Sequence, residues 1–208
     1  VLFRSDRFRP EQLFALDQWH YHGTDAIRDA AAFLQIGPRT RVLDVGSGIG
    51  GPARFLAHTT GCHVVALELQ PDLHAIGLDL TRRCGLESRV THVCGDALTH
   101  PIMPSTFDAV LIAVSVQYMT DPYAVFAEIG RVLSPGGTVI VAMSHRCFPT
   151  KAIYAFHVLA PSERMQLVGS YMDRAGAFEN IEALDRSPPA ADPLWLVRGT
   201  RSTLPGAQ

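Results

Sequence analysis

The segment that most constrains this chain is residues 41–52, which read RVLDVGSGIGGP. A short run of branched apolar residues carries one acid, Asp44, and then meets four closely spaced glycines and Pro52. This order predicts a buried strand, a turn too tight for side chains, and a helix that begins near the proline. A helix N-terminus offers unpaired N–H groups with a partial positive charge, and glycines let a ligand approach the backbone. The segment therefore predicts a nucleotide-like ligand at the loop.

Apolar runs and helical patterns alternate along the chain around this segment. The expected strands are residues 41–45, 63–68, 89–93, 107–114 and 138–143, with a turn at 134–137 before the last one. Strands that are apolar along their whole length are buried on both faces, as in a parallel sheet that helices cover. The pattern predicts an α/β fold with a Rossmann-like, doubly wound sheet that is mostly parallel.

The C-terminal part of the chain has a different pattern. Residues 151–175 have helical character, and two extended runs, 178–184 and 194–199, follow on either side of a Ser-Pro-Pro loop. Two strands in succession without a helix between them predict an antiparallel hairpin at the edge of the sheet. Because the sequence contains neither an internal repeat nor a linker, we expect one domain over residues 24–208. Residues 1–23 are expected to form part of a lid.

The composition argues against a protein that binds nucleic acid or inserts into a membrane. The net charge is −2, and Lys151 is the only lysine among 18 basic residues, so a surface that neutralises phosphate backbones is not expected. No apolar run reaches the length of about 18 residues needed to span a bilayer. The four cysteines lie far apart without a Cys-x-x-Cys pair, which is typical of reduced thiols in a cytoplasmic protein. His20 and His22 have no third metal ligand beside them, so no metal site is assigned.

Acidic residues follow two of the expected strands, at the edge of the sheet where ligands of open α/β folds bind. Glu68 lies where a carboxylate can accept hydrogen bonds from both hydroxyls of a ribose, although a solvated strand end would also place an acid there. Asp96 could accept a hydrogen bond from an adenine amino group, or be an ordinary turn aspartate. Asp44 could hold the N–H groups of the glycine loop or face a ligand ammonium group. The acids therefore favour a nucleoside.

The glycines alone do not decide which nucleotide binds. Three of them satisfy the G-x-G-x-x-G pattern of dinucleotide sites, and Glu68 lies near the distance at which an acid is expected. A nicotinamide-dependent oxidoreductase is therefore one alternative. The only lysine, Lys151, is preceded four residues earlier by Cys147, whereas the short-chain reductases need a tyrosine there, and no chain remains for a second catalytic domain. A phosphate-binding P-loop is excluded because no Gly-Lys-Ser/Thr occurs.

Several segments, taken in order, resemble the motifs of class I S-adenosylmethionine-dependent methyltransferases. Those segments are residues 42–50, Glu68, residues 95–97, residues 107–110 and residues 133–137. The resemblance covers about residues 24–200, including the antiparallel hairpin. It implies S-adenosylmethionine as cofactor and a small-molecule methyl acceptor. Residues 50–54 and 19–21 are similar to methyltransferases that act on amines or quinone precursors.

The resemblance also implies which residues contact the cofactor. The set is Asp44, Gly46, Ser47, Gly48, Gly50, Glu68, Leu69, Asp96, Ala97, Ala113 and Gln117. The glycines would pass under the methionine part, Glu68 would bind the ribose, and Leu69 would lie beside the adenine. The family often has a polar residue where Ala113 stands, so a contact there must come from the backbone. Gln117 stands where relatives often carry a histidine.

The chemistry implied by the resemblance puts few demands on side chains. Methyl transfer from a sulfonium is an in-line displacement, for which positioning supplies up to about 7–11 kcal/mol. A general base is needed only where the acceptor must lose a proton. The residues expected to line the acceptor pocket are Trp19, His20, Tyr21, His22, Gln117, Tyr118, His145 and Arg146. Among them His145 and Tyr21 are the candidate catalytic residues. A domain that binds the cofactor without catalysis is a further alternative.

Overall fold

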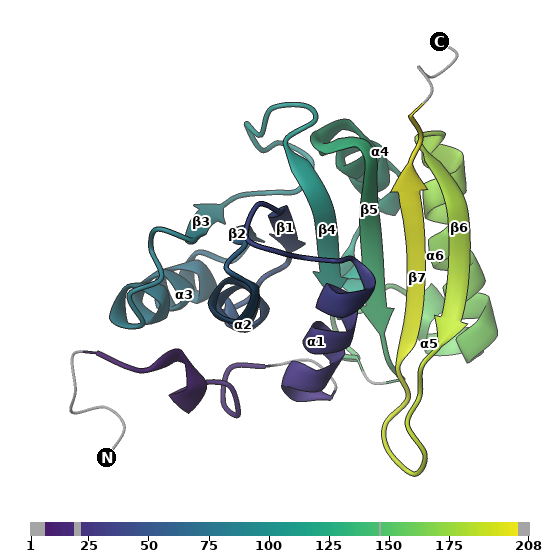
Figure 1. Ribbon diagram of the computed structural model, residues 1–208. Helices are drawn as coiled ribbons and strands as arrows, with labels where there is room; N and C mark the ends of the chain where they lie inside the picture. The colour runs from purple at the N-terminus through teal and green to yellow at the C-terminus, as the bar shows by residue number, and fades with distance from the viewer. Residues whose placement is uncertain (1–6, 19–21, 146, 204–208) are drawn as a thin grey trace. The chain divides into compact units, whose positions relative to one another are not determined.

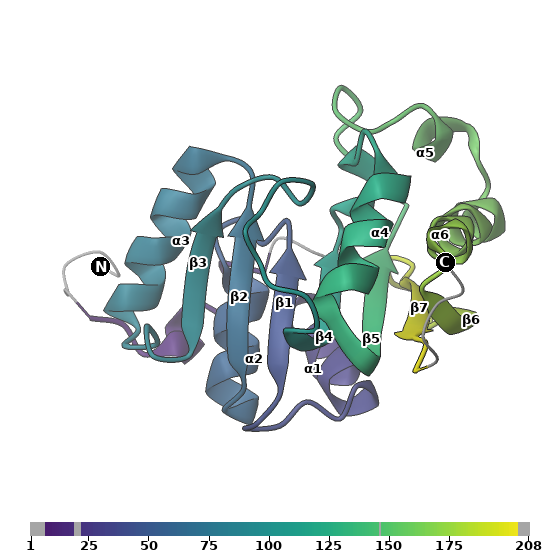
Figure 2. The ribbon, with the colours of Figure 1, turned by 90° about the horizontal axis from the view of Figure 1, so that it is seen from above.

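The computed structural model describes residues 7–18, 22–145 and 147–203 (Figure 1). The chain divides into two compact units, Val1–Asp96 and Ala97–Gln208. Each unit contains strands that pair with one another and helices that pack on them (Figure 2). The catalytic candidate Tyr21 lies outside the described residues.

The first unit carries the glycine-rich segment. Its elements are η2 (Pro10–Gln12), α1 (Gly23–Phe33), β1 (Arg41–Val45), α2 (Gly51–Thr60), β2 (His63–Glu68), α3 (Pro71–Arg83) and β3 (Val90–Cys94). The strands are parallel and lie in the order β3-β2-β1, side by side in Figure 2. Val42, Leu43 and Val64 are fully enclosed, because helices cover strands that are apolar along their length. The glycine loop thus leaves β1 at the carboxyl end of a parallel sheet.

The second unit contains the C-terminal hairpin. Its elements are β4 (Phe107–Ala113), η3 (Val116–Tyr118), α4 (Pro122–Val132), β5 (Leu133–Met143), α5 (Ala155–Val158), α6 (Pro161–Ala175), β6 (Phe178–Asp185) and β7 (Trp195–Arg201). The order is β4-β5-β7-β6: β4 and β5 are parallel, and β7 is antiparallel to both β5 and β6. The α4 and α6 helices meet through the rings of Phe126 and Tyr171, whose centroids are 5.9 Å apart. The predicted antiparallel hairpin is confirmed.

The sequence predicted that the fifth strand begins at residue 138. In the structure it begins earlier, at Leu133. Phe107 pairs with Leu133 and Ala109 pairs with Thr138, so the register shifts between these two pairs. The expected turn at 134–137 is therefore a bulge inside a longer strand. Gly136 accommodates it with a φ of 79°, a value that side-chain-bearing residues rarely adopt.

Together the pairings confirm the predicted fold class. Both units contain parallel strands, and the antiparallel pairs are confined to the C-terminal strands of the second unit. The chain therefore has an α/β fold that is mostly parallel with an antiparallel C-terminal hairpin. Across the described ranges, no helix is both long and apolar enough to cross a membrane.

Candidate functional site

The glycine loop between β1 and α2 is held by its own backbone. The N–H groups of Gly46 and Ser47 donate to the carbonyl oxygen of Leu67, at 2.9 and 3.1 Å, and that of Gly50 donates to Ser47 at 2.8 Å. Gly46, Gly48 and Gly50 have φ values of 73°, 55° and 80°, which explains why the loop needs glycines. A Cβ atom at Gly48 would meet nothing within 4 Å. The loop therefore has one fixed shape and an open side at Gly48.

Glu68, at the end of β2, ties this loop to the neighbouring strand. Its Oε2 accepts a hydrogen bond from the N–H of Gly48 at 2.7 Å, and its Oε1 accepts one from Gln70 at 2.9 Å. Such bonds to a charged acceptor are about twice as strong as neutral ones. Each carboxylate oxygen keeps a further lone pair. Glu68 thus fixes the loop, and its expected contact with a ribose stays a prediction.

Asp44 and Ser47 present buried polar atoms that lack partners. The Asp44 side chain is only 1% exposed, and neither its Oδ2 nor the Ser47 Oγ has a hydrogen-bond partner among the described residues. Burial, and then the charge of Glu68, raises the pKa of Asp44 to about 7. A buried polar atom without a partner is costly, so a native protein that keeps two of them calls for an explanation. A ligand with a positive charge and a donor would satisfy both atoms.

The other candidates of the first unit lie around Glu68. Leu69 is 65% exposed, an unusual state for a large apolar side chain next to a buried strand end. The N–H of Gly95 donates to the carbonyl oxygen of Glu68 at 3.0 Å, which places the turn that contains Asp96 beside the end of β2. The first unit therefore brings the glycine loop, Glu68, Leu69 and Asp96 together, and their contacts with a cofactor stay a prediction.

The second unit contains the remaining cofactor candidates. Ala97 begins this unit. Ala113 ends β4 opposite Ala142 of β5, and Gln117 follows in η3, where its Oε1 is buried without a partner among the described residues. Val114, between them, has a φ of 58°. A β-branched residue in this region is a genuine outlier, and such strain of about 1–3 kcal/mol gathers at functional sites. Sequence reasoning missed Val114, because nothing in its neighbours predicts that conformation.

His145 lies just past the end of β5 and is partly exposed. Its Nε2 lies 3.9 Å from Oδ1 of Asp192, and the preceding Ser144 donates through its hydroxyl to the carbonyl oxygen of Pro193 at 2.6 Å. The structure therefore places the candidate base beside a carboxylate, which can orient the ring. The pocket candidates Trp19, His20 and Arg146, like Tyr21, are outside the described residues. Within the described ranges, no cluster of three His, Cys, Asp or Glu residues could hold a metal ion.

Sequence reasoning also missed a buried ion pair close to the loop. Arg54 lies inside α2 and is 1% exposed, and its guanidinium donates to the carboxylate of Asp17, which is 3% exposed, at 2.8 Å. The only signal was an arginine within the otherwise apolar run 51–57. Its partner is 37 residues away, so no local pattern indicates the pair.

The observed site has the features of a known family. Residues 43–141 match the family model described as "Methyltransferase domain". The match begins in β1, includes the glycine loop and Glu68, and ends within β5. The chain contains a class I S-adenosylmethionine-dependent methyltransferase domain. The resemblance seen in the motifs is thereby confirmed, and this domain includes residues of both units.

Two curated relatives illustrate the range of proteins to which this methyltransferase domain is similar. Over 114 residues it is 37% identical to the glycine/sarcosine/dimethylglycine N-methyltransferase of Actinopolyspora halophila, which covers 55% of this chain and 20% of the relative. Over 176 residues it is 30% identical to the 24-methylenesterol C-methyltransferase 2 of Oryza sativa subsp. japonica. This match covers 79% of this chain and 48% of the relative. The chain thus spans half or less of the length of these relatives.

A solved structure supports the assignment of the fold. Phosphoethanolamine N-methyltransferase 2 of Haemonchus contortus, in complex with S-adenosyl-L-methionine, superposes with a TM-score of 0.73 at 20% sequence identity. The match covers 93% of this chain and 56% of the other. At this identity the likeness establishes a shared fold, and it extends over nearly the whole methyltransferase domain.

Proposed function

We propose that this domain binds S-adenosylmethionine and transfers its methyl group to a small-molecule acceptor. The observation that carries the proposal is the state of the glycine loop. The N–H groups of Gly46, Ser47, Gly48 and Gly50 all donate to partners within the protein, so they do not form the anion cradle of a pyrophosphate site. The loop instead offers open space at Gly48, and Asp44, which precedes the loop in β1, keeps a buried oxygen without a partner among the described residues.

The charges of Asp44 and Glu68 favour one of the two candidate cofactors, S-adenosylmethionine and a nicotinamide dinucleotide, over the other. Asp44 and Glu68 lie close enough for the charge of one to raise the pKa of the other. The pyrophosphate of a dinucleotide would add negative charge next to two carboxyl groups, whereas a cation would relieve their repulsion. When bound, S-adenosylmethionine supplies an electrophilic methyl group on a positively charged sulfur. The acids therefore favour this cofactor over a nicotinamide dinucleotide.

The chain's own residues fit the parts of this cofactor. The buried Oδ2 of Asp44 is available to a cationic donor, and the free lone pairs of Glu68 suit ribose hydroxyls. Exposed Leu69 offers an apolar surface to the adenine, and Asp96 offers an acceptor for its amino group. Ala113 and Gln117 are proposed to contact the amino-acid portion and the acceptor.

His145 is proposed as the general base for acceptors that lose a proton. Asp192 can hold the ring in place and stabilise the positive charge that it gains when it takes the proton. Tyr21 is proposed as a second residue of the acceptor pocket, on the basis of its position in the sequence. Acceptors such as amines that react without prior deprotonation would need only positioning, and for them His145 would matter little.

The organisation of the chain follows from the same proposal. We propose that residues 24–208 act as one methyltransferase domain and that residues 1–23 contribute to its lid. The family match supports this because it runs from residue 43 to residue 141 across the boundary at Asp96. The free thiols of Cys62, Cys84, Cys94 and Cys147 support a reducing, cytoplasmic location.

A thermal-unfolding titration tests the proposed function. S-adenosylhomocysteine at 100 times its dissociation constant should stabilise the protein by about 2.7 kcal/mol, and NADH should not stabilise it. Stabilisation by NADH alone would contradict the proposal. Turnover assays with amine, phenol and carboxylate acceptors then distinguish the enzyme from a domain that binds the cofactor without catalysis.

A further inference from the structure

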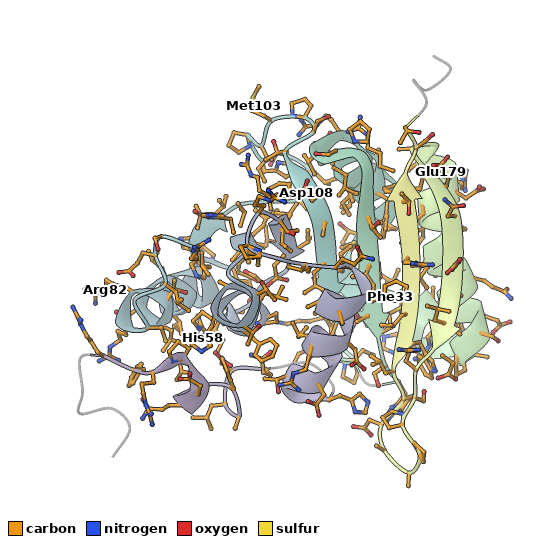
Figure 3. The ribbon with its side chains drawn as sticks, in the orientation of Figure 1. Phe33, His58, Arg82, Met103, Asp108 and Glu179 are labelled. Atoms are coloured by element: carbon orange, nitrogen blue, oxygen red, sulfur yellow. The ribbon has the colours of Figure 1, made fainter. Side chains whose placement is uncertain are left out.

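Residues 7–18, called here the N-terminal segment, dock on α2 and α3 of the first unit. The N–H of Phe8 donates to the carbonyl oxygen of Arg83 at 2.9 Å, and the guanidinium of Arg83 lies 4.8 Å from the centroid of the Phe8 ring. The rings of Phe14 and Phe55 meet edge to face, 5.0 Å apart. Figure 3 labels His58, which lies on the side of α2 that faces this segment. The segment is therefore a packed part of the unit.

The end of this segment lies against the first residue of α2. A Cβ atom at Gly51 would collide with the carbonyl oxygen of Asp17 and lie 3.1 Å from Nε2 of Gln18. Gly51 must therefore be a glycine for the segment to reach this position. The buried Asp17 side chain accepts two hydrogen bonds from Arg54, one from Nη2 at 2.8 Å and one from Nε at 3.3 Å. Backbone contact and ion pair together join the segment to the helix that follows the glycine loop.

Arg54 continues this connection towards the loop. Its Nη1 donates to the hydroxyl of Thr81 at 3.3 Å, and Thr81 Oγ1 lies 2.8 Å from Nε2 of His92. Burial, and then the charge of Arg54, lowers the pKa of His92 to about 4, so the neutral ring can accept the proton of the Thr81 hydroxyl. A Cβ atom at Gly50 would lie 2.7 Å from Cε1 of His92. The network therefore ends in contact with Gly50, the last residue of the glycine loop.

A buried ion pair needs a reason beyond stability. Its desolvation often offsets its attraction, so apolar residues of similar volume would stabilise the fold as well or better. Removing one partner, however, leaves an uncompensated charge in the interior and is strongly destabilising. Such a pair therefore allows one docked position of the segment and disfavours others. The same network contacts the glycine loop at Gly50 and Gly51, so the segment and the loop share their supports.

We propose that Asp17 and Arg54 are positioning residues that couple docking of the N-terminal segment to occupancy of the glycine loop. The inference rests on the proposed cofactor site. A ligand that fixes the loop also fixes Gly50 and Gly51 and thereby favours the docked segment, and by reciprocity the docked segment favours the ligand.

Hydrogen exchange of the wild-type protein tests the coupling without any substitution. The Phe8 amide, bonded to Arg83, and the Asp17 amide, bonded to Leu13, report on the segment, and the Gly48 amide reports on the loop. Saturating S-adenosylhomocysteine should slow exchange at all three amides, by roughly tenfold at Phe8 and Asp17. Slower exchange at Gly48 with no change at Phe8 and Asp17 would overturn the inference and leave the cofactor site intact.

Two variants of the same segment sharpen the test. Asp17→Asn removes the buried charge, whereas Glu11→Gln removes an exposed pair with His58, which is 2.8 Å long in the structure. Asp17→Asn should weaken binding of S-adenosylhomocysteine about tenfold and raise the KM for S-adenosylmethionine with kcat unchanged. Glu11→Gln should change neither. Equal affinities for the wild type and Asp17→Asn would overturn the coupling, while a wild type that fails to bind the ligand would speak against the proposed function. If Asp17→Asn does not fold, the exchange measurement decides alone.

Discussion

The glycine loop of the first unit and the segment that follows β5 in the second unit differ in how far their side chains are exposed. The loop is held by backbone hydrogen bonds, its Gly48 N–H donates to Glu68, and the buried acid Asp44 precedes it in β1. The segment over residues 147–160 also has backbone hydrogen bonds, among them one from the N–H of Ile153 to the carbonyl oxygen of Gln117 at 2.9 Å. The N–H of Phe148 donates to the hydroxyl of Tyr118 at 3.0 Å. The segment carries several exposed large apolar side chains, of which Tyr154 is 78% exposed.

This difference explains which part of the function can be assigned. A loop whose N–H groups are already bonded within the protein has one shape and fits one kind of ligand. A short segment with exposed side chains can change its residues at little cost to stability. We therefore expect large effects on cofactor binding and stability from the first region and small effects from the second.

The largest effect is expected from Asp44→Asn. The pKa of Asp44 rises from 3.8 to about 7 in the folded protein, so the folded state keeps a proton that the unfolded chain releases between these pH values. Stability therefore falls as pH rises through this window, by roughly 4 kcal/mol in total. The asparagine has no such loss, so the variant should exceed the wild type in stability at pH 8 and bind S-adenosylmethionine more weakly. Urea unfolding at pH 5 and pH 8 measures the difference, and parallel pH dependences would contradict the account of Asp44.

Glu68→Ala should reduce cofactor affinity about 100-fold. The substitution removes the acceptor of two backbone N–H groups, those of Gly48 and Gln70, and each bond to a charged group contributes about 1.5–3 kcal/mol. Calorimetric titration with S-adenosylhomocysteine measures the loss. Glu87→Ala, at an exposed acid of the same unit, is the matched control and should bind like the wild type. Unchanged affinity in Glu68→Ala would mean that the loop does not depend on this carboxylate.

His145→Gln tests the proposed general base, which lies just past the end of β5. For a phenolic acceptor the rate should fall by about 100-fold, the lower end of the range for general bases. For an amine that is already deprotonated, kcat should stay within about twofold. The affinity for S-adenosylhomocysteine serves as control and should not change. A variant that methylates the phenol at the wild-type rate would remove His145 from the mechanism.

The smallest effect on stability is expected from Tyr154→Ser. Because the ring is exposed, its loss should change the free energy of unfolding by less than about 0.5 kcal/mol and leave cofactor affinity unaltered. Urea unfolding and calorimetric titration with S-adenosylhomocysteine measure these two quantities. A large loss of stability or of cofactor affinity would break the contrast between the two regions.

The sequence predicted the first region well because its determinants are local. The three glycines with positive φ and the acid at the end of the next strand can be recognised directly in the sequence. The Asp17–Arg54 pair could not be predicted, because the two residues are 37 positions apart and meet only through tertiary packing. The bulge at 134–137 was read as a turn, since a proline and two glycines suit either structure. The φ of Val114 contradicts the preference of its residue type and needed the structure.

The central claim is that the buried acid beside the glycine loop meets a cationic cofactor. Titration calorimetry with S-adenosylmethionine at pH 7, repeated in buffers of different ionisation enthalpy, counts the protons released on binding. With a pKa of about 7, Asp44 is roughly half protonated, so binding should release about half a proton per site in the wild type. Asp44→Asn should release none. Tight binding to the wild type without proton release would contradict the claim.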